Sequence, residues 1–249
     1  MAMTPAVEAR SMTRVLAGTV PVTLVREIDV AIMPGEFVAI TGPSGSGKSS
    51  LLYLLGLLDR PTEGRVLIHG VDTSPMDGEM LAELRLARIG FVFQFHFLLP
   101  EFTAFNNVLV PMRKLGRWEE GEARERARRL LTDVGLDDQM HKRPDQMSGG
   151  QRQRVAIARS MANDPDIILA DEPTGSLDQK NGQIVFDIFA RLAAEYRKSV
   201  ITVTHDPHLA ERTHRVIGLV DGRIVDHGHS AGPAPPSSPD VIVPGPGAI

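Results

Sequence analysis

The chain has 249 residues, of which 42% are hydrophobic and 23% are charged, so it is long enough to bury a core. Its formal net charge of -4 argues against a general nucleic-acid binder, and its lack of cysteine excludes disulfides and thiolate metal sites. No apolar run approaches the ~20 residues that span a bilayer, and the first residues lack the apolar region of a signal peptide. We therefore expect no nucleic-acid partner and no direct insertion into a membrane.

The two ends of the chain are expected to contribute little to the fold. Residues 1–12 are expected to be loose, because chain termini often lack packing partners. Residues 231–249 (AGPAPPSSPDVIVPGPGAI) contain six prolines, and this composition excludes a helix or a central strand. We therefore predict a single domain over 13–229, followed by a disordered tail over 230–249.

Between the two ends, short apolar runs alternate with helical patterns, which predicts an α/β fold. Two of the runs are almost entirely apolar, as expected for parallel strands that are covered on both faces. Strands are predicted at 36–40, 88–93, 166–171, 199–205 and 214–220. Helices are predicted at 119–133 and 149–162, so that about 95–163 forms a mainly helical subdomain.

The loop after the first predicted strand matches the phosphate-binding pattern G-x-x-x-x-G-K-[ST]. Its glycines let successive backbone N–H groups point toward one centre, and the next helix adds its positive N-terminal end. We expect Lys48 to reach the β- and γ-phosphates of a nucleotide and Ser49 to bind Mg²⁺. A flexible loop with a chance lysine is the alternative, but strand, loop and helix occur in the required order. The candidate ATP-binding residues are Gly42, Pro43, Ser44, Gly45, Ser46, Gly47, Lys48, Ser49 and Ser50.

Two acidic residues end the strand predicted at 166–171. Asp171 stands where P-loop enzymes hold Mg²⁺. Its neighbour Glu172 points to the other side of the strand and is a candidate to orient or deprotonate the attacking water. The alternative is an acidic pair that closes a strand before the turn at Pro173. The phosphate-binding loop earlier in the chain favours the catalytic interpretation.

Four further motifs accompany the phosphate-binding loop and the acidic pair. MSGGQ opens the second predicted helix with Ser148 as its N-cap, and Gln94 follows the strand predicted at 88–93. SLD occupies 176–178, and THD contains His205. Each motif alone has an ordinary structural explanation. In this order, however, the six resemble the Walker A, Q-loop, signature, Walker B, D-loop and H-loop of the nucleotide-binding subunits of ABC transporters, over about 22–225.

The resemblance implies a RecA-like P-loop NTPase core with a helical subdomain and an N-terminal antiparallel β part. It also implies a homodimer with two sandwiched ATP molecules, each held by the Walker A loop of one chain and the signature of the other. The implied signature contacts are Ser148, Gly149, Gly150 and Gln151, and Asp178 lies at the dimer interface. The implied catalytic residues are Glu172, His205 and Gln94, and the implied Mg²⁺ residues are Ser49, Gln94 and Asp171.

One expected feature of the family is absent. ABC ATPases usually stack an aromatic residue ahead of the Walker A loop on the adenine base. No aromatic precedes Phe37 in this chain, and Val15 aligns with that position. Because base–aromatic stacking contributes ~1–3 kcal/mol, we expect weaker ATP binding and looser base selectivity, extending to GTP.

The segment from Glu83 to Met112 resembles one branch of the family in particular. It is similar to the ATPases of bacterial lipoprotein-releasing exporters (LolD-like), whose relatives include MacB-type macrolide exporters and FtsE-type cell-division ATPases. This resemblance implies an ATPase on the cytoplasmic face of the bacterial inner membrane. Its nucleotide-driven closure would power a permease that exports or extracts lipoprotein, lipid, peptide or drug, a mechanism called mechanotransmission.

Residues 96–105 are predicted to receive a cytoplasmic helix of that permease, because they follow Gln94 and are rich in apolar side chains. Phe91 and Phe93 are expected in the core instead. Three alternative functions are a soluble ABC-type ATPase acting on DNA or ribosomes, an FtsE-like regulator of cell-wall remodelling, and an ATP clamp without turnover. The single set of motifs and the absence of a heptad run argue against the first, and the presence of Glu172 and His205 argues against the last.

Overall fold

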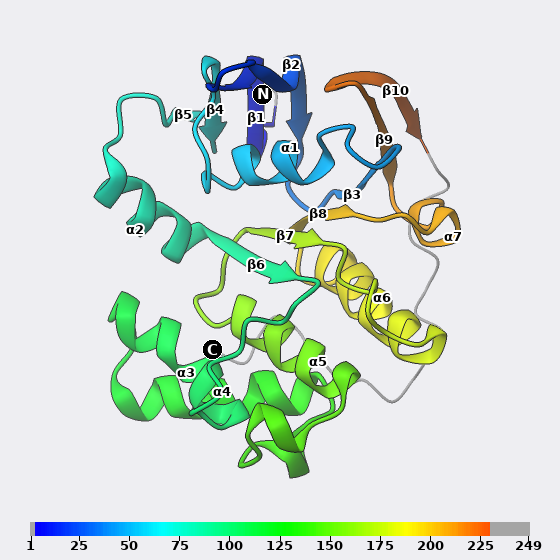
Figure 1. Cartoon of the computed structure of the whole chain (residues 1–249). Coiled ribbons are helices and arrows are strands. Elements are labelled where there is room, and N and C mark those ends of the chain that lie inside the picture. Colours follow the sequence, from blue (N-terminus) through cyan, green and yellow to red (C-terminus); the bar gives the residue numbers. More distant parts are fainter. Residues whose placement is uncertain (1–2, 230–249) are drawn as a thin grey trace.

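The computed structural model describes residues 3–229, so the tail predicted over 230–249 lies outside the described residues. A six-stranded sheet forms the centre of the molecule (Figure 1). Its five parallel strands carry the short apolar runs of the sequence, and one antiparallel strand closes an edge. The order across the sheet is β10 (Arg223–His229), β9 (Arg215–Val220), β3 (Phe37–Thr41), β8 (Ser199–Val203), β7 (Ile167–Asp171) and β6 (Ile89–Phe93).

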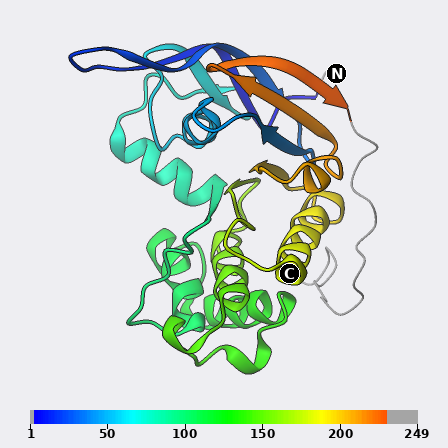
Figure 2. The ribbon, with the colours of Figure 1, turned by 45° about the vertical axis from the view of Figure 1, so that its right-hand side comes forward.

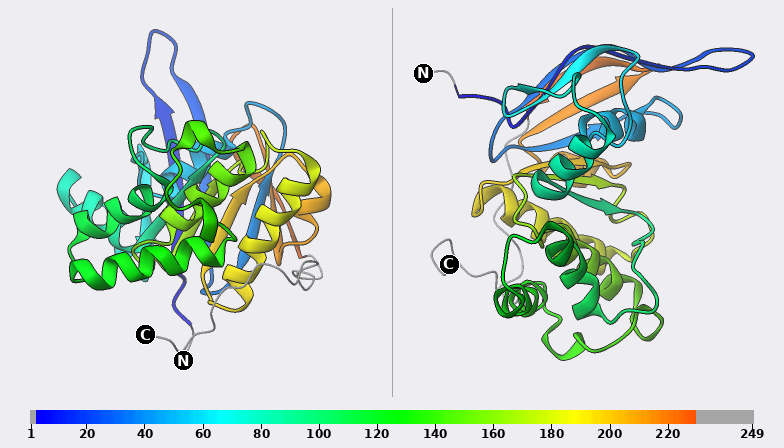
Figure 3. Two further views of the ribbon diagram at one scale, coloured as in Figure 1. Left: turned by 90° about the horizontal axis from the view of Figure 1, so that it is seen from below. Right: turned by 90° about the vertical axis from the view of Figure 1, so that its left-hand side faces the viewer.

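A second, antiparallel sheet contains the N-terminal residues. Its order is β2 (Val22–Ile32), β1 (Val7–Leu16), β4 (Glu63–Ile68) and β5 (Val71–Asp72). The expectation that residues 1–12 are loose is therefore wrong for residues 7–12, which form most of β1. Val7, Ala9 and Met12 are buried because this sheet packs against α1 and the central sheet. The far end of the β1–β2 hairpin projects beyond the rest of the molecule (Figure 2; Figure 3).

Helices cover the central sheet and form a separate group at the end opposite the antiparallel sheet. The group consists of α3, α4 and α5, which lie together below the sheet in Figure 1. The predicted helices at 119–133 and 149–162 correspond to α4 and α5. The helices are α1 (Lys48–Leu55), α2 (Gly78–Arg88), α3 (Ala104–Leu115), α4 (Glu120–Asp133), α5 (Gly149–Ser160), α6 (Gln179–Ala194) and α7 (Pro207–Ala210), with short 3-10 turns at Asp137–Gln139 and Pro144–Gln146.

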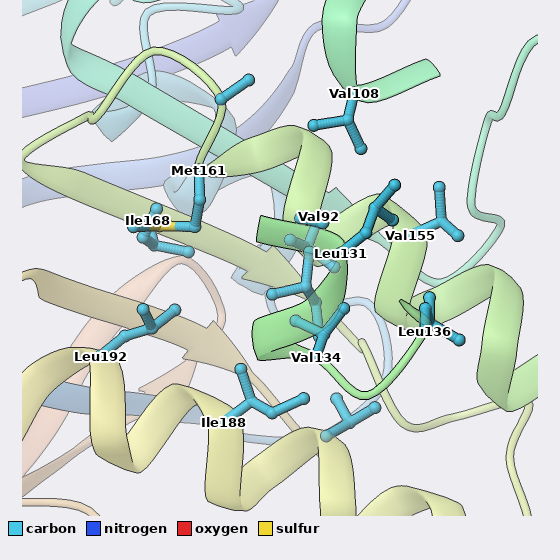
Figure 4. Packing of buried hydrophobic residues seen from close by; sticks show 14 of the residues in the cluster. Val92, Val108, Leu131, Val134, Leu136, Val155, Met161, Ile168, Ile188 and Leu192 are labelled. Carbon is cyan, nitrogen blue, oxygen red and sulfur yellow. The ribbon is translucent and has the colours of Figure 1, made fainter. Parts of the chain in front are cut away.

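Alternate residues of the central strands enter two different hydrophobic cores. Ile167 and Leu169 of β7 pack with α1 and the antiparallel sheet, whereas Ile168 between them packs with α5 and α6. Figure 4 shows this second core, in which Ile168 and Val92 meet side chains of the helical group. Each fully buried aliphatic side chain contributes ~1.5–3 kcal/mol. Burial on both faces explains why these strands read as continuous apolar runs.

Phe91 and Phe93 are half-buried rather than fully buried in the core, as had been expected. Their strand, β6, is at the edge of the sheet and pairs only with β7. Val92 faces the helical core and is buried, while Phe91 packs at the margin of the other core. Because an edge strand lacks a neighbour on one side, its large side chains are covered less completely.

Trp118 is the only tryptophan of the chain and lies in the turn between α3 and α4. The guanidinium groups of Arg117 and Arg126 lie 5.3 and 5.1 Å from the centre of its ring. Arg126 also donates to the backbone oxygens of Ala162 and Met161, just after α5. These contacts join α4 to the end of α5. Within residues 3–229, none of the helices is long and apolar enough to cross a bilayer.

Candidate functional site

The phosphate-binding loop leads from the end of β3 into α1, as predicted. Gly42 has a φ of +146° and Gly47 a φ of +97°. A Cβ atom at Gly42 would lie 2.0 Å from the backbone oxygen of Leu219, and one at Gly47 would lie 2.2 Å from that of Leu24. The loop is therefore pressed against β9 and β2, and both its dihedral angles and its contacts require glycine.

Lys48 lies inside this loop. Its side chain is buried, and its Nζ donates to the backbone oxygens of Gly42 (3.0 Å) and Pro43 (2.7 Å). Nearby, the hydroxyl of Ser46 is buried without a hydrogen-bond partner among the described residues. A buried ammonium group and an unsatisfied hydroxyl, together with the N-terminus of α1, fit an anionic phosphate.

Asp171, at the end of β7, accepts hydrogen bonds on both carboxylate oxygens. Ser49 Oγ donates to Oδ1 at 2.9 Å, and Tyr53 OH donates to Oδ2 at 2.7 Å. Ser49 and Asp171, two of the residues expected to bind Mg²⁺, are therefore in contact, and hydroxyl and carboxylate oxygens are the ligands that Mg²⁺ prefers. Burial and the hydrogen bond to Asp171 raise the pKa of Tyr53 to about 12, so the phenol is a donor at neutral pH.

Tyr53 was not predicted as a site residue. A signal for it is present in the sequence, because Tyr53 follows Ser49 by four positions in α1 and so lies on the same face of the helix. The contact itself joins residues that are 118 positions apart. A motif search along the chain does not reveal such a contact.

Glu172 and His205 follow neighbouring parallel strands, β7 and β8. His205 Nε2 lies 2.7 Å from Glu172 Oε1, and the His205 side chain is about half exposed. Glu172 has a φ of +47°, a left-handed conformation that is unfavourable for a side chain of this size. Both residues line a cavity of about 290 Å³, together with Thr174, Gly175, Thr204 and Asp206. A carboxylate is thus held by an imidazole at an accessible cavity.

Gln94 leaves the end of β6 at the same edge of the sheet. Its backbone oxygen lies 3.5 Å from Ser176 Oγ, and a Cβ atom at Gly175 would lie 3.1 Å from its Nε2. Gln94 therefore contacts the turn that follows Glu172. The carboxyl ends of parallel strands meet at one edge of a sheet, where α/β proteins commonly bind ligands.

Ser148 caps α5, as predicted. Its Oγ accepts from the backbone N–H of Gln151 at 3.2 Å, and Gln151 Oε1 accepts from the Ser148 N–H at 2.8 Å. Asp178 caps α6 in the same way and accepts from the Asn181 backbone N–H at 2.9 Å; this bond lowers the pKa of Asp178. A Cβ atom at Gly150 would lie 2.3 Å from Asn181 Oδ1. The start of α5 therefore lies against the first turn of α6, which Asp178 of the SLD motif caps.

Val15, which aligns with the base-stacking position, pairs with Thr23 across the β1–β2 hairpin. The next residue of β2, Leu24, provides the backbone oxygen that faces Gly47. Val15 therefore lies opposite the part of β2 that contacts the end of the phosphate-binding loop. The side chain there is aliphatic and half-buried.

The segment after Gln94 exposes large apolar side chains at its surface. The exposed fractions are 67% for Phe95, 65% for Phe97, 41% for Leu99 and 38% for Phe102. Phe105, the last residue of the predicted docking segment, is buried in α3 instead. Beside the segment, a groove of about 390 Å³ runs between β6 and α3. It is lined among others by Phe91, Phe93, Leu99, Pro111, Lys114 and Arg159.

Side chains of α3 and α5 bind the backbone of this exposed segment. Arg159 of α5 donates to the backbone oxygens of Phe97 (2.6 Å) and His96 (2.8 Å). Asn107 is buried and bonds to the backbone of Leu99 and Phe102. His96 Nε2 lies 3.1 Å from the backbone oxygen of Gly149, and burial lowers the pKa of His96. The neutral ring is then the donor, and it joins the segment to the start of α5.

The family model described as ABC transporter matches residues 25–175, which is more than half of the chain. The chain belongs to the ABC transporter family. The lipoprotein-releasing system ATP-binding protein LolD of Aquifex aeolicus is 49% identical over 202 residues, covering 81% of this chain and 89% of LolD. The LolD protein of Anaeromyxobacter dehalogenans is 47% identical over 226 residues, covering 90% of this chain and 95% of that protein.

Other ABC proteins are similar over the same region. The macrolide export ATP-binding/permease protein MacB of Bartonella henselae is 49% identical, but the match covers only 31% of its length. Among solved structures, the dimeric post-hydrolysis state of an ATP-binding cassette bound to ADP and Pi superimposes with a TM-score of 0.83 at 40% identity. That match covers 90% of this chain and 98% of the cassette. The predicted fold and the assignment as an ABC-type ATPase are therefore confirmed.

Proposed function

We propose that this ABC ATPase hydrolyses ATP at the sheet edge formed by β3, β7 and β8, with Glu172 as the general base. The observation that carries the proposal is the contact of 2.7 Å between Glu172 Oε1 and His205 Nε2, at a cavity next to the carboxyl ends of β7 and β8. The backbone N–H groups of the loop and Lys48 bind the β- and γ-phosphates. His205 holds the carboxylate of Glu172 and contacts the γ-phosphate.

In the proposed reaction, Glu172 accepts a proton from the attacking water. The water oxygen forms a bond to the γ-phosphorus, and the bond from that phosphorus to the β–γ bridging oxygen breaks. ADP and inorganic phosphate are the products. Gln94, which contacts the turn after Glu172, orients the water.

Mg²⁺ fits the oxygen ligands at Ser49 and Asp171, with Gln94 as a further ligand. When bound, the ion neutralises negative charge on the β- and γ-phosphates. Ser49 and Asp171 are already joined by a hydrogen bond of 2.9 Å, so these side chains are held in place before the ion binds.

We further propose a homodimer that sandwiches two ATP molecules. Each ATP molecule lies between the Walker A loop of one chain and the signature of the other. The signature residues are Ser148, Gly149, Gly150 and Gln151. The dimeric state of the cassette structure bound to ADP and Pi supports this arrangement. The N-terminus of α5 then supplies a second set of backbone donors for the γ-phosphate.

Replacing Glu172 tests the proposal. Glu172→Gln keeps the size of the side chain but removes the base, so turnover should fall by a factor of ~10²–10⁴. ATP binding should persist, and the ATP-bound dimer should accumulate in light-scattering measurements. Glu211→Gln, an exposed residue of the same type, is the matched control. Undiminished turnover in the Glu172 variant would show that another residue acts as the base.

The partner proposed for this ATPase is a permease in a bacterial inner membrane, with the ATPase peripheral on its cytoplasmic face. A cytoplasmic helix of the permease would dock in the groove between β6 and α3, near residues 96–102. The exposed side chains of Phe97, Leu99 and Phe102 support this surface, because contiguous apolar patches commonly mark interaction sites. The similarity to LolD proteins supports lipoprotein release as the transport function.

A further inference from the structure

Tyr53 is the one hydrogen-bonding partner of Asp171 to which the proposed mechanism gives no role. The chain contains two tyrosines, and the other, Tyr196, follows α6. Tyr53 OH donates to Asp171 Oδ2 at 2.7 Å. The phenol therefore contacts the carboxylate on the oxygen that Ser49 leaves unbound.

Both donors to the Asp171 carboxylate lie on the same face of α1. Ser49 and Tyr53 are four residues apart in α1, and each donates to a different oxygen of Asp171. Rotation of the carboxylate about its last side-chain bond moves both oxygens, so with two donors it disrupts two hydrogen bonds rather than one.

Neighbouring rings hold Tyr53 in the orientation that this contact requires. The ring of Phe93 lies 6.4 Å from that of Tyr53 in an edge-to-face arrangement, and Phe91 stacks on Phe93 at 5.8 Å. Tyr53 also packs at the margin of the core between α1 and the antiparallel sheet. Its hydroxyl is thus directed by packing as well as by its hydrogen bond.

We propose that Tyr53 is a positioning residue for Mg²⁺, acting by fixing the orientation of Asp171. The inference rests on the proposed function, in which Asp171 holds the ion. Residues that hydrogen-bond to a metal ligand orient it, and their loss typically weakens metal binding by ~10–100-fold. Removing the Tyr53 hydroxyl leaves Oδ2 without its donor, so that Ser49 alone restrains the rotation of the carboxylate.

The test measures Mn²⁺ binding to the nucleotide-bound protein, with the free ion counted by electron paramagnetic resonance in the presence of saturating ADP. Tyr53→Phe keeps the ring and its packing and removes only the hydroxyl. We expect its Mn²⁺ affinity to fall ~10-fold or more, with ADP binding in EDTA unchanged. Tyr196→Phe is the matched control and should bind Mn²⁺ as the unmodified chain does.

Asp171→Asn in the same assay separates the proposed metal role of Asp171 from the proposed positioning role of Tyr53. If Asp171→Asn does not weaken Mn²⁺ binding, the proposed metal role of Asp171 is wrong. If it does, while Tyr53→Phe binds Mn²⁺ equally well or more tightly, only the positioning role is wrong. Equal losses of ADP binding with and without Mn²⁺ in Tyr53→Phe would assign Tyr53 a structural role and also overturn the inference.

Discussion

At the scale of the residue, Val15 occupies the position that we propose to contact the nucleotide base. Val15 stands on β1 opposite Thr23, one position from the Leu24 oxygen that faces Gly47. An aliphatic side chain offers dispersion contacts to either purine, but no ring on which a base can stack. The proposed consequence is weak discrimination between adenine and guanine nucleotides.

Replacing Val15 by phenylalanine tests this consequence. Stacking contributes ~1–3 kcal/mol, so Val15→Phe should tighten ADP binding by a factor of about five to a hundred. Calorimetric titrations with ADP and GDP measure both this gain and the selectivity of the unmodified chain. Val20→Phe, at an exposed position of the same hairpin, is the control. A strong preference of the unmodified chain for ADP over GDP would contradict the proposed loose selectivity.

The candidate site was predictable at this scale wherever a motif is contiguous. The Walker A loop needs successive backbone groups, so its residues are necessarily neighbours in the sequence. The same holds for the cap at Ser148, which bonds to Gln151 within one turn. Tyr53 was missed because its bond to Asp171 depends on how α1 packs against β7, and local sequence does not encode that distance.

At the scale of the element, α4 ends on a buried carboxyl group. Asp133 is the last residue of the helix, where the helix dipole already disfavours a negative charge. Burial raises its pKa to about 7, and Arg129, Arg191 and Arg126 only partly oppose this shift. Tyr196 lies near this carboxyl group: burial raises the pKa of Tyr196 to about 12, and the charges of Asp133 and Glu195 raise it further.

This carboxyl group should make stability depend on pH. The folded pKa lies above the ordinary value, so the folded state binds the proton more tightly than the unfolded state between about pH 4 and pH 7. The free energy of unfolding should therefore fall as pH rises through this window, with a slope of at most ~1.4 kcal/mol per pH unit from this group. Asp133→Asn should remove that fall.

Urea unfolding at about pH 5 and about pH 7.5 measures the effect of Asp133→Asn. The variant should gain stability relative to the unmodified chain at the higher pH. Asp145→Asn, an exposed residue in the same helical group, controls for the loss of one negative charge. The same pH dependence in both variants would show that Asp133 is ionised in the folded protein across this range.

The strands of the central sheet could be predicted from the sequence, but the partners of each strand and the exposure of its side chains were harder to predict. The five parallel strands of the central sheet lie within two residues of their predicted limits, because burial on both faces gives continuous apolar runs, whereas the antiparallel edge strand β10 was not predicted. β1 was missed since polar residues interrupt its buried positions and one partner, β4, lies far along the chain. The partial exposure of Phe91 and Phe93 follows from the edge position of β6, a property of the whole sheet.

At the scale of the whole molecule, the segment proposed to dock the permease lies where the two cores meet. Its strand, β6, contributes Val92 to one core and Ile89 to the other. Arg159 and His96 join the segment to α5, which begins with the signature. A partner bound there would thus contact a surface connected by hydrogen bonds to a proposed nucleotide contact.

The docking proposal predicts a selective loss of assembly. In the double variant Leu99→Asp, Phe102→Asp, two charges replace exposed apolar contacts, and losing a central contact typically costs ~2 kcal/mol or more, about 30-fold in affinity. Copurification with a coexpressed permease should fail, while ATP hydrolysis by the isolated chain persists. Val71→Asp, at an exposed apolar position on β5, is the control. Intact copurification of the double variant would mean that the permease binds elsewhere.

Trp118, enclosed by Arg117 and Arg126, provides the protein with an intrinsic optical probe. Because the chain has no other tryptophan, indole fluorescence reports on the α3–α4 turn alone. The environment of the helical group can therefore be followed in time as nucleotide is added, without attaching a dye.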